Sequence, residues 1–99
     1  MNFSLPRRKL GYFCRRWKIR ELALFGSVLR DDFRPDSDVD LLVSFDPTAD
    51  WSVFDLVSMQ EELSAILGRE VDLVEREALR NPFRRHTILN NREIIYAAG

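Results

Sequence analysis

The apolar residues of this chain are arranged either at helical spacing or in short continuous runs. This pattern predicts the elements of the chain. Four apolar residues follow the i, i+3, i+4, i+7 spacing of an amphipathic helix: Leu10, Phe13, Cys14 and Trp17. Short and almost wholly apolar runs at 22–25, 39–45 and 71–74 are typical of buried strands. The pattern therefore predicts one helix near the start of the chain, followed by three strands.

A longer helix is predicted between the second and third strands. Pro47 breaks the chain after the second strand, and Asp50 or Ser52 can cap the helix that follows. Gly68 stands where a glycine commonly ends a helix. Six apolar residues of this segment are expected to face the core: Val53, Leu56, Met59, Leu63, Ile66 and Leu67.

The last part of the chain predicts one more helix and a short tail. Asn81 and Pro82 have the residue types of an N-cap and a first helical position, so we expect a helix from there to about Asn90. The apolar segment 94–96 forms either a short strand or a closing turn. With no internal repeat and no linker, the elements predict one α/β or α+β domain over residues 1–99.

Composition excludes several classes of protein. The chain is 45% hydrophobic and 31% charged, which is ordinary for a soluble globular protein. No apolar run approaches the roughly 20 residues that cross a bilayer, and residues 1–13 lack the apolar core of a signal peptide. The only cysteine, Cys14, can form no internal disulfide. We therefore expect a cytoplasmic protein that has no membrane partner.

Charge is distributed unevenly along the chain. Residues 1–20 hold seven Lys and Arg and no acidic residue, whereas the rest of the chain holds eight basic and 16 acidic residues. Such an asymmetry indicates a docking surface for an acidic partner or a nucleic acid. The alternative is that these residues form the solvated face of an amphipathic helix.

Two aspartates open the second apolar run. Because side chains alternate along a strand, Asp38 and Asp40 project from the same side, roughly 6.5–7 Å apart, and Val39 projects from the other. Carboxylates this close repel each other unless a cation lies between them. Mg²⁺ accepts such ligands together with substrate phosphates. A polar hairpin or a solvent-facing strand edge produces the same pair, so the pair alone does not define a metal site.

A Gly-Ser turn follows the first apolar run. Gly26 lets the backbone approach a bulky anion, and the unpaired N–H groups of a short helix starting at Val28 can bind that anion, assisted by the helix dipole. Ser27 adds a hydroxyl donor. A triphosphate bound there would lie beside the two aspartates. The alternative is a simple tight turn with Ser27 as an N-cap.

A further carboxylate, Asp72, interrupts the third apolar run. A charge in a buried run is costly unless it is paired or bound to a metal. If this strand lies beside the second strand, three carboxylates meet at one place. The alternative is an edge strand on which Asp72 faces water.

Other residues with possible chemistry have simpler explanations. His86 has no Cys or His partner at metal-ligand spacing and is expected on a helix surface. Trp17 and Trp51 are expected to pack in the core or an interface rather than to stack on bases. Arg84 and Arg85 could reach nucleotide phosphates, although a solvated helix face is the default.

Together these features resemble the minimal nucleotidyltransferase domain of the DNA polymerase β superfamily. The family pattern is a Gly-Ser pair, ten residues, and two aspartates separated by one residue. Here it is complete, as Gly26-Ser27, residues 28–37, and Asp38-Val39-Asp40. The surrounding residues are also similar, over nearly the whole chain. The resemblance implies a small mixed sheet packed by helices.

The resemblance also implies a mechanism. Asp38 and Asp40 would hold two Mg²⁺ ions, and Asp72 would complete the metal site and help to deprotonate the acceptor hydroxyl. Gly26 and Ser27 would cradle the β- and γ-phosphates of a nucleoside triphosphate, while the α-phosphorus is attacked and pyrophosphate leaves.

One basic residue completes the implied site. Arg30 matches a basic position near the phosphates in this group of proteins. Its alternative is a surface arginine that pairs with Asp31 or Asp32.

Larger members of the superfamily carry a second domain for the base and the acceptor, and none is expected here. Stand-alone minimal nucleotidyltransferases are commonly paired with a helical HEPN-type protein in what resemble toxin–antitoxin systems. In these pairs the nucleotidyltransferase is the antitoxin and adds AMP from ATP to a tyrosine of the HEPN ribonuclease. The resemblance implies the same partner here, and we expect the basic N-terminal helix to dock on it. Direct binding to nucleic acid is not the expectation.

Two other functions stay open. The chain could be a non-catalytic antitoxin that neutralises its toxin by binding, or an enzyme that modifies a small molecule or an RNA end. Metal-dependent consumption of ATP separates the non-catalytic function from the other two.

Overall fold

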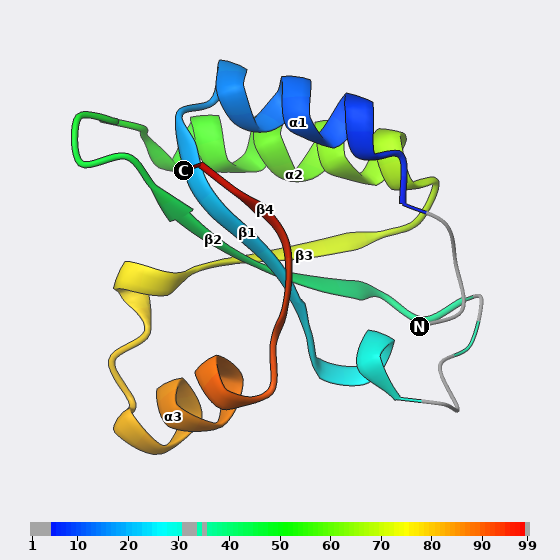
Figure 1. Cartoon of the computed structure of the whole chain (residues 1–99), viewed down its shortest axis with the longest axis vertical. Coiled ribbons are helices and arrows are strands. Elements are labelled where there is room, and N and C mark those ends of the chain that lie inside the picture. Colours follow the sequence, from blue (N-terminus) through cyan, green and yellow to red (C-terminus); the bar gives the residue numbers. More distant parts are fainter. Residues whose placement is uncertain (1–4, 31–33, 35, 99) are drawn as a thin grey trace.

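The computed structural model describes residues 5–30, 34 and 36–98, and the elements follow the predicted order (Figure 1). The helices are α1 (Arg7–Arg16), α2 (Val53–Leu67) and α3 (Pro82–Asn90). The strands are β1 (Ile19–Phe25), β2 (Val39–Phe45), β3 (Val71–Glu75) and β4 (Glu93–Ala97). Two short 3₁₀ helices follow strands, η1 (Gly26–Leu29) after β1 and η2 (Arg76–Ala78) after β3.

The four strands form one mixed sheet in the order β3-β2-β1-β4. β1 pairs antiparallel with both β2 and β4, whereas β3 runs parallel to β2. The parallel pair is joined by α2, because a parallel connection needs a crossover element. The expected mixed sheet packed by helices is confirmed, and residues 94–96 lie in a strand rather than a turn.

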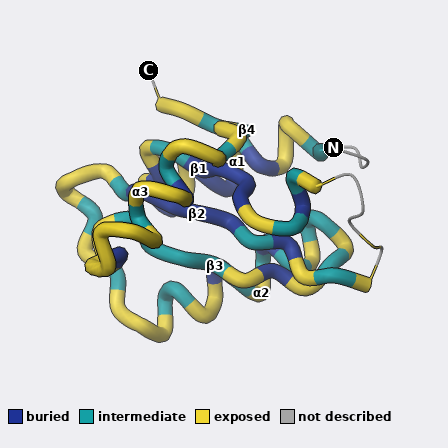
Figure 2. The backbone as a smooth tube through the Cα atoms, turned by 90° about the horizontal axis from the view of Figure 1, so that it is seen from below, coloured by how far each residue is buried: buried dark blue, intermediate teal, exposed yellow. Residues whose placement is uncertain are grey.

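Helices cover both faces of the sheet. α1 and α2 lie on one face and α3 lies on the other (Figure 1). The alternation along β2 follows this arrangement, since Val39, Leu41 and Val43 belong to the core under α1 and α2. Leu42 belongs to a smaller core that includes Ile88 of α3. Asp40, two positions before Leu42, therefore projects toward the α3 face. Figure 2 shows burial concentrated in the two central strands, β1 and β2.

Local signals define the helix ends as expected. Ser52 is the N-cap of α2 and forms a capping box with Asp55. Gly68 ends α2 in the left-handed conformation, at φ +67°. The Asn81 side chain accepts hydrogen bonds from two backbone N–H groups at the start of α3, and Pro82 is the first residue of the helix.

The two tryptophans pack together between α1 and the start of α2. Their rings meet edge to face, with centroids 5.0 Å apart. The Trp51 indole N–H donates to the Trp17 carbonyl at 2.8 Å, and the Trp17 indole N–H donates to Glu62 at 2.7 Å. Their expected role in packing is confirmed. Cys14 is completely buried beside them in the same core.

One core prediction is wrong. Val53 was expected to face the core, but its residue is 73% exposed. Burial increases along α2, from half-buried Leu56 to fully buried Met59 and Leu63. The first turn of the helix lies at the margin of the core, so its inward row still faces solvent.

None of the helices that the structure describes combines the length and the apolar character that a membrane span needs.

Candidate functional site

Two of the predicted carboxylates occupy directly paired positions on neighbouring strands. The parallel register between β2 and β3 joins Val39 with Val71 and Asp40 with Asp72. Such partners lie one strand spacing apart, about 4.8 Å, and project to the same face. β3 is an edge strand and Asp72 is exposed. Asp72 therefore faces water on an edge strand, as one alternative expected, and also lies beside Asp40, as the other expected.

The Gly-Ser turn lies directly against the same carboxylate. The antiparallel register pairs Phe25 with Asp40. Gly26, the next residue after Phe25, therefore lies next to Asp40. Gly26 has φ +74°, a conformation that side-chain-bearing residues rarely adopt. A Cβ atom at this position would lie 2.5 Å from Asp40 Oδ2. The backbone conformation at position 26 therefore favours glycine, and a side chain there would displace the Asp40 carboxylate.

The helix that follows this turn is only one turn long. η1 covers Gly26–Leu29, and the Arg30 backbone N–H closes it on the Ser27 carbonyl at 3.0 Å. So short a helix aligns few peptide dipoles. An anion at this turn would therefore be bound by individual N–H groups and the Ser27 hydroxyl, rather than by the helix dipole that the sequence suggested.

A cavity of about 430 Å³ adjoins the turn. Its lining includes Gly26, Ser27 and Arg30 on one side. The other side is formed by α3, through Thr87, Ile88 and Asn91. The three residues predicted to bind the nucleotide therefore line one cavity. The alternative partners of Arg30, Asp31 and Asp32, lie outside the described residues.

The carboxylates act on one another electrostatically. Burial raises the pKa of Asp40 above its ordinary value, and the negative charges of Asp72 and then Asp38 raise it further. Arg84 on α3 opposes this increase, because its positive charge stabilises the ionised form of Asp40. The structure therefore brings all three predicted aspartates within electrostatic reach, with an arginine from a third element beside them.

The donor atoms fit a hard divalent cation in kind. Asp38, Asp40 and Asp72 offer oxygen ligands, and their mutual repulsion would be relieved by a bound cation. However, within the described part of the chain, no three His, Cys, Asp or Glu side chains are already arranged to hold a metal ion. Binding of one ion by all three carboxylates would therefore require these side chains to rearrange.

Sequence reasoning treated one residue of this neighbourhood as solvated surface. Arg84 was assigned by default to a solvated helix face, and it is exposed, but its charge also acts on Asp40. Thr87 and Asn91, which line the cavity, are not among the predicted site residues. The available signal was the spacing i, i+3 and i+7 of these polar residues, which places them on one face of the last helix.

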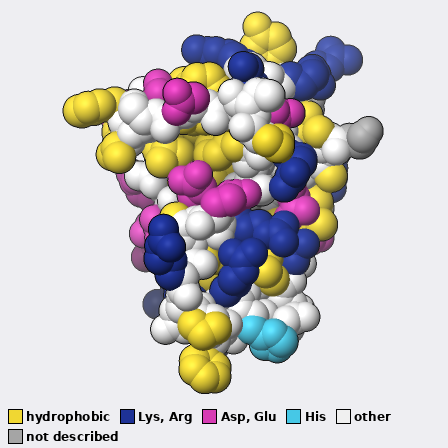
Figure 3. Space-filling model, turned by 90° about the vertical axis from the view of Figure 1, so that its left-hand side faces the viewer, with side chains coloured by type: hydrophobic (Ala, Val, Ile, Leu, Met, Phe, Trp, Pro, Cys, Tyr) yellow, Lys and Arg dark blue, Asp and Glu magenta, His cyan; other side chains and the backbone are white. Residues whose placement is uncertain are grey.

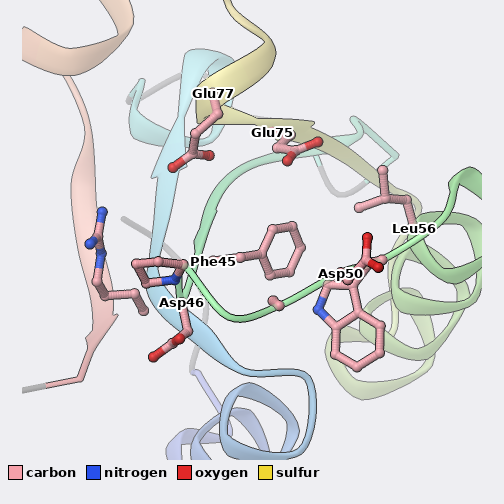
Figure 4. A pocket seen from close by; sticks show the side chains of 10 residues that line it. Phe45, Asp46, Asp50, Leu56, Glu75 and Glu77 are labelled. Atoms are coloured by element: carbon pink, nitrogen blue, oxygen red, sulfur yellow. The ribbon is translucent and has the colours of Figure 1, made fainter.

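A second pocket, of about 380 Å³, lies at the other end of the sheet (Figure 4). Phe45, the last residue of β2, points into the middle of this pocket. Glu75 and Glu77 lie along one side of it and Asp50 along another. Five positions separate Phe45 from Asp40 along β2, which is about 17 Å in a strand. This acidic pocket is therefore separate from the predicted site.

Comparison with known proteins agrees with this geometry. A family model described as a nucleotidyltransferase domain matches residues 7–95. Protein adenylyltransferase MntA of Thermococcus cleftensis is 38% identical over 81 residues, which cover 82% of this chain and 77% of that protein.

Two solved structures share the fold. The first is a toxin–antitoxin structure with AMP-PNP, with a TM-score of 0.74 and 19% identity, over 95% of this chain and 75% of the other. The second is a tri-AMPylated HEPN toxin of Shewanella oneidensis in complex with an MNT antitoxin. It matches with a TM-score of 0.66 and 17% identity, over 93% of this chain and 70% of the other.

The chain belongs to the nucleotidyltransferase domain family. It is a nucleotidyltransferase, an enzyme that joins a nucleotidyl group to an acceptor. The resemblance inferred from the Gly-Ser turn and the aspartate pair is thereby confirmed.

Proposed function

We propose that this protein is an antitoxin that transfers AMP from ATP, in a Mg²⁺-dependent reaction, to a tyrosine of a HEPN-type helical toxin. The observation that carries the proposal is the position of Asp40. It lies between Gly26, which its carboxylate contacts, and Asp72, its register partner on β3. A nucleotide bound at the turn would thus have its phosphates next to the carboxylates.

Each residue has a role in this proposal. Asp38, Asp40 and Asp72 would hold two Mg²⁺ ions, which when bound stabilise the charge that develops on the phosphate oxygens. The N–H groups and hydroxyl of Gly26 and Ser27 would bind the β- and γ-phosphates. Arg30, which lines the same cavity, and the turn would fix the triphosphate so that its α-phosphorus faces the acceptor.

The transfer step needs only ATP and the tyrosine hydroxyl as reactants. The tyrosine oxygen forms a bond to the α-phosphorus, and the bond from that phosphorus to the bridging oxygen of the β-phosphate breaks. Pyrophosphate leaves with the bonding electrons, and the Asp72 carboxylate takes the hydroxyl proton. Asp72 suits this role because it is exposed at the edge of the sheet, where an acceptor protein can approach.

Relatives support the acceptor. The archaeal relative is named a protein adenylyltransferase, and one neighbour of the same fold is an antitoxin in complex with an AMPylated HEPN toxin. A protein acceptor also agrees with the exposure of Asp72 on the edge strand β3, since a partner protein can bring its hydroxyl to this edge.

The surface of α1 is the proposed docking site for that partner. A groove of about 430 Å³ runs between α1 and α2. Its apolar floor includes Phe13 and Ile66, and Arg8 and Lys9 are among the basic residues on its rim. Tyr12, also in the lining, is 67% exposed. A partner segment with apolar residues flanked by carboxylates would complement this groove in shape and charge.

Labelled ATP provides the test. The protein is incubated with Mg²⁺, its HEPN-type partner and ATP labelled at either the α- or the γ-phosphate. Transfer of AMP predicts α-label bound to the partner, and loss of that label after removal of Mg²⁺ or in the Asp38→Asn/Asp40→Asn variant. Substitution of the acceptor tyrosine by Phe should also remove it.

Other outcomes favour other functions. Bound γ-label without α-label would indicate phosphoryl transfer and contradict the proposed mechanism. An intact complex without label would favour an antitoxin that acts by binding alone. Label on RNA or on a small molecule would favour a different acceptor.

A further inference from the structure

The face of α3 that meets the sheet also meets the predicted nucleotide site. Ile88 packs in the smaller core with Phe25 and Leu42, on the face toward which Asp40 projects. Phe25 immediately precedes Gly26. α3 is therefore held by its core contacts directly over the Gly-Ser turn and the start of β2.

Three residues of α3 and its C-cap lie at the spacing i, i+3, i+4 and i+7 along this face: Arg84, Thr87, Ile88 and Asn91. The last three line the cavity together with Gly26 and Ser27. Arg84 lies one turn closer to the start of α3, and helix side chains incline toward the N-terminus. Arg84 therefore continues the row of side chains that lines the cavity, one turn beyond Thr87 and Ile88.

The neighbouring arginines of this region have structural partners. Arg85 donates to the Arg76 carbonyl at 3.0 Å, and Arg92 donates to Glu21 at 3.0 Å. Arg84 differs from them. Among the residues that the structure describes, none forms a hydrogen bond or an ion pair with its guanidinium group, and the residue is exposed. Figure 3 shows basic side chains gathered over α3 in the lower half of the molecule, below a group of acidic ones.

We propose that Arg84 binds the triphosphate of the nucleotide from the side opposite Gly26 and Ser27, so that α3 forms the second wall of the nucleotide site. This inference rests on the proposed nucleotide site. A triphosphate placed beside Asp38, Asp40 and Asp72 meets strong repulsion, and a cation on the open side lowers it. The planar guanidinium group can donate two parallel hydrogen bonds to phosphate oxygens.

Equilibrium binding of ATP and of inorganic tripolyphosphate to the full chain tests this role. Arg84→Gln should weaken the binding of both ligands by the same factor, roughly ten- to a hundredfold, because both present the same phosphates. Arg84→Lys should retain part of the affinity, since it keeps the charge but not the two-pronged geometry. The control is Arg80→Gln, which removes an exposed arginine just before α3 and should leave both affinities unchanged.

None of the three substitutions is expected to unfold the protein. The Asn81 side chain caps the backbone N–H of residue 84, and that bond is independent of the Arg84 side chain. Circular dichroism of each variant checks this. Unchanged affinity of Arg84→Gln for both ligands would overturn the inference, and so would weaker binding of ATP alone, which would indicate a contact with the base or ribose.

The binding test of Arg84 and the transfer test of the proposed function can be told apart by their results. If the wild-type protein binds ATP and tripolyphosphate but transfers no AMP, the proposed activity is wrong while the binding measurements still decide the role of Arg84. If the wild-type protein binds neither ligand, the nucleotide site and the role of Arg84 are both wrong. In an active preparation, Arg84→Gln should raise the KM for ATP more than it lowers kcat.

Discussion

The carboxylate of Asp40 occupies the space that a side chain on Gly26 would need. A Cβ atom at position 26 would lie 2.5 Å from Asp40 Oδ2, and the backbone there has φ +74°. We therefore expect Gly26→Ala to displace the Asp40 carboxylate and to abolish AMP transfer. The strained backbone alone should lower the free energy of unfolding by roughly 1–2 kcal/mol, measured by urea denaturation.

Gly68→Ala is the matched control for this prediction. Gly68 has φ +67°, but among the described residues no atom beyond its own helix and chain neighbours lies within 4 Å of the place where its Cβ would be. The two substitutions should therefore cost similar backbone strain, while only the change at position 26 removes activity. Equal transfer rates in the two variants would contradict a specific role for the contact between Gly26 and Asp40.

Asp40 should reduce the stability of the native state at neutral pH. Its pKa is raised in the folded protein above the ordinary value of 3.8, by burial and by the charges of Asp72 and Asp38. Between these two pKa values the folded state holds more protons than the unfolded state, so stability falls as the pH rises through that window. Asp40→Asn removes this dependence and should be more stable than wild type at pH 7.

The expected gain is small, up to about 1 kcal/mol, because solvent screens charges that are only partly buried. Urea denaturation of both proteins at a series of pH values measures it. The curves should converge below the ordinary pKa of Asp40 and separate above it. The variant should also be inactive in AMP transfer. The two results together would show that Asp40 serves the reaction although it lowers the stability of the fold.

Glu62 joins α1 to α2 through two contacts. It accepts the indole N–H of Trp17 at 2.7 Å and forms an ion pair with Arg16 at 2.6 Å. Glu62→Ala should lower the free energy of unfolding by about 1–3 kcal/mol, mainly because it leaves the partly buried indole N–H unpaired. The control, Glu61→Ala, changes an exposed neighbour and should stay within about 0.5 kcal/mol of wild type. Thermal unfolding followed by tryptophan fluorescence would report both.

The single cysteine should be chemically inert in the native state. Cys14 is completely buried, and burial raises the pKa of its thiol to about 12. Almost no thiolate exists at mildly alkaline pH, so a thiol reagent such as DTNB should react only after the protein is unfolded in urea. Rapid reaction without urea would show that α1 opens away from the sheet.

The basic rim of the α1–α2 groove should control the rate of association with the HEPN-type partner. Arg8→Glu reverses a charge on that rim and should slow association by about tenfold or more at low ionic strength. Arg16 is a poorer choice for this test because it also pairs with Glu62. Surface plasmon resonance at several salt concentrations would measure the rate.

The control reverses an equal charge far from the groove. Arg80→Glu changes an exposed arginine before α3 and should leave the association rate near that of wild type. If both variants associate equally slowly, the effect is one of net charge, and docking at α1 is not supported.

Several features followed from short segments of sequence. The ends of α2 and α3 were predicted from Ser52, Gly68 and Asn81, because a cap depends on a few consecutive residues. The bounds of β2 were predicted from a nearly continuous apolar run, because both faces of this central strand are covered. Val53 was predicted wrongly because periodicity states the direction of a side chain but not how far the core extends along the helix.

The sequence by itself determined the turn, the ten-residue spacing and the three aspartates, since the chain carries these features wherever it folds. Only the tertiary structure decided that Asp72 lies beside Asp40, that Gly26 contacts the same carboxylate, and that the charge of Arg84 on α3 acts on Asp40. The reason is physical. Covalent geometry fixes neighbours within one helix or strand, whereas strand order and the face that a helix covers depend on packing between residues far apart in the chain.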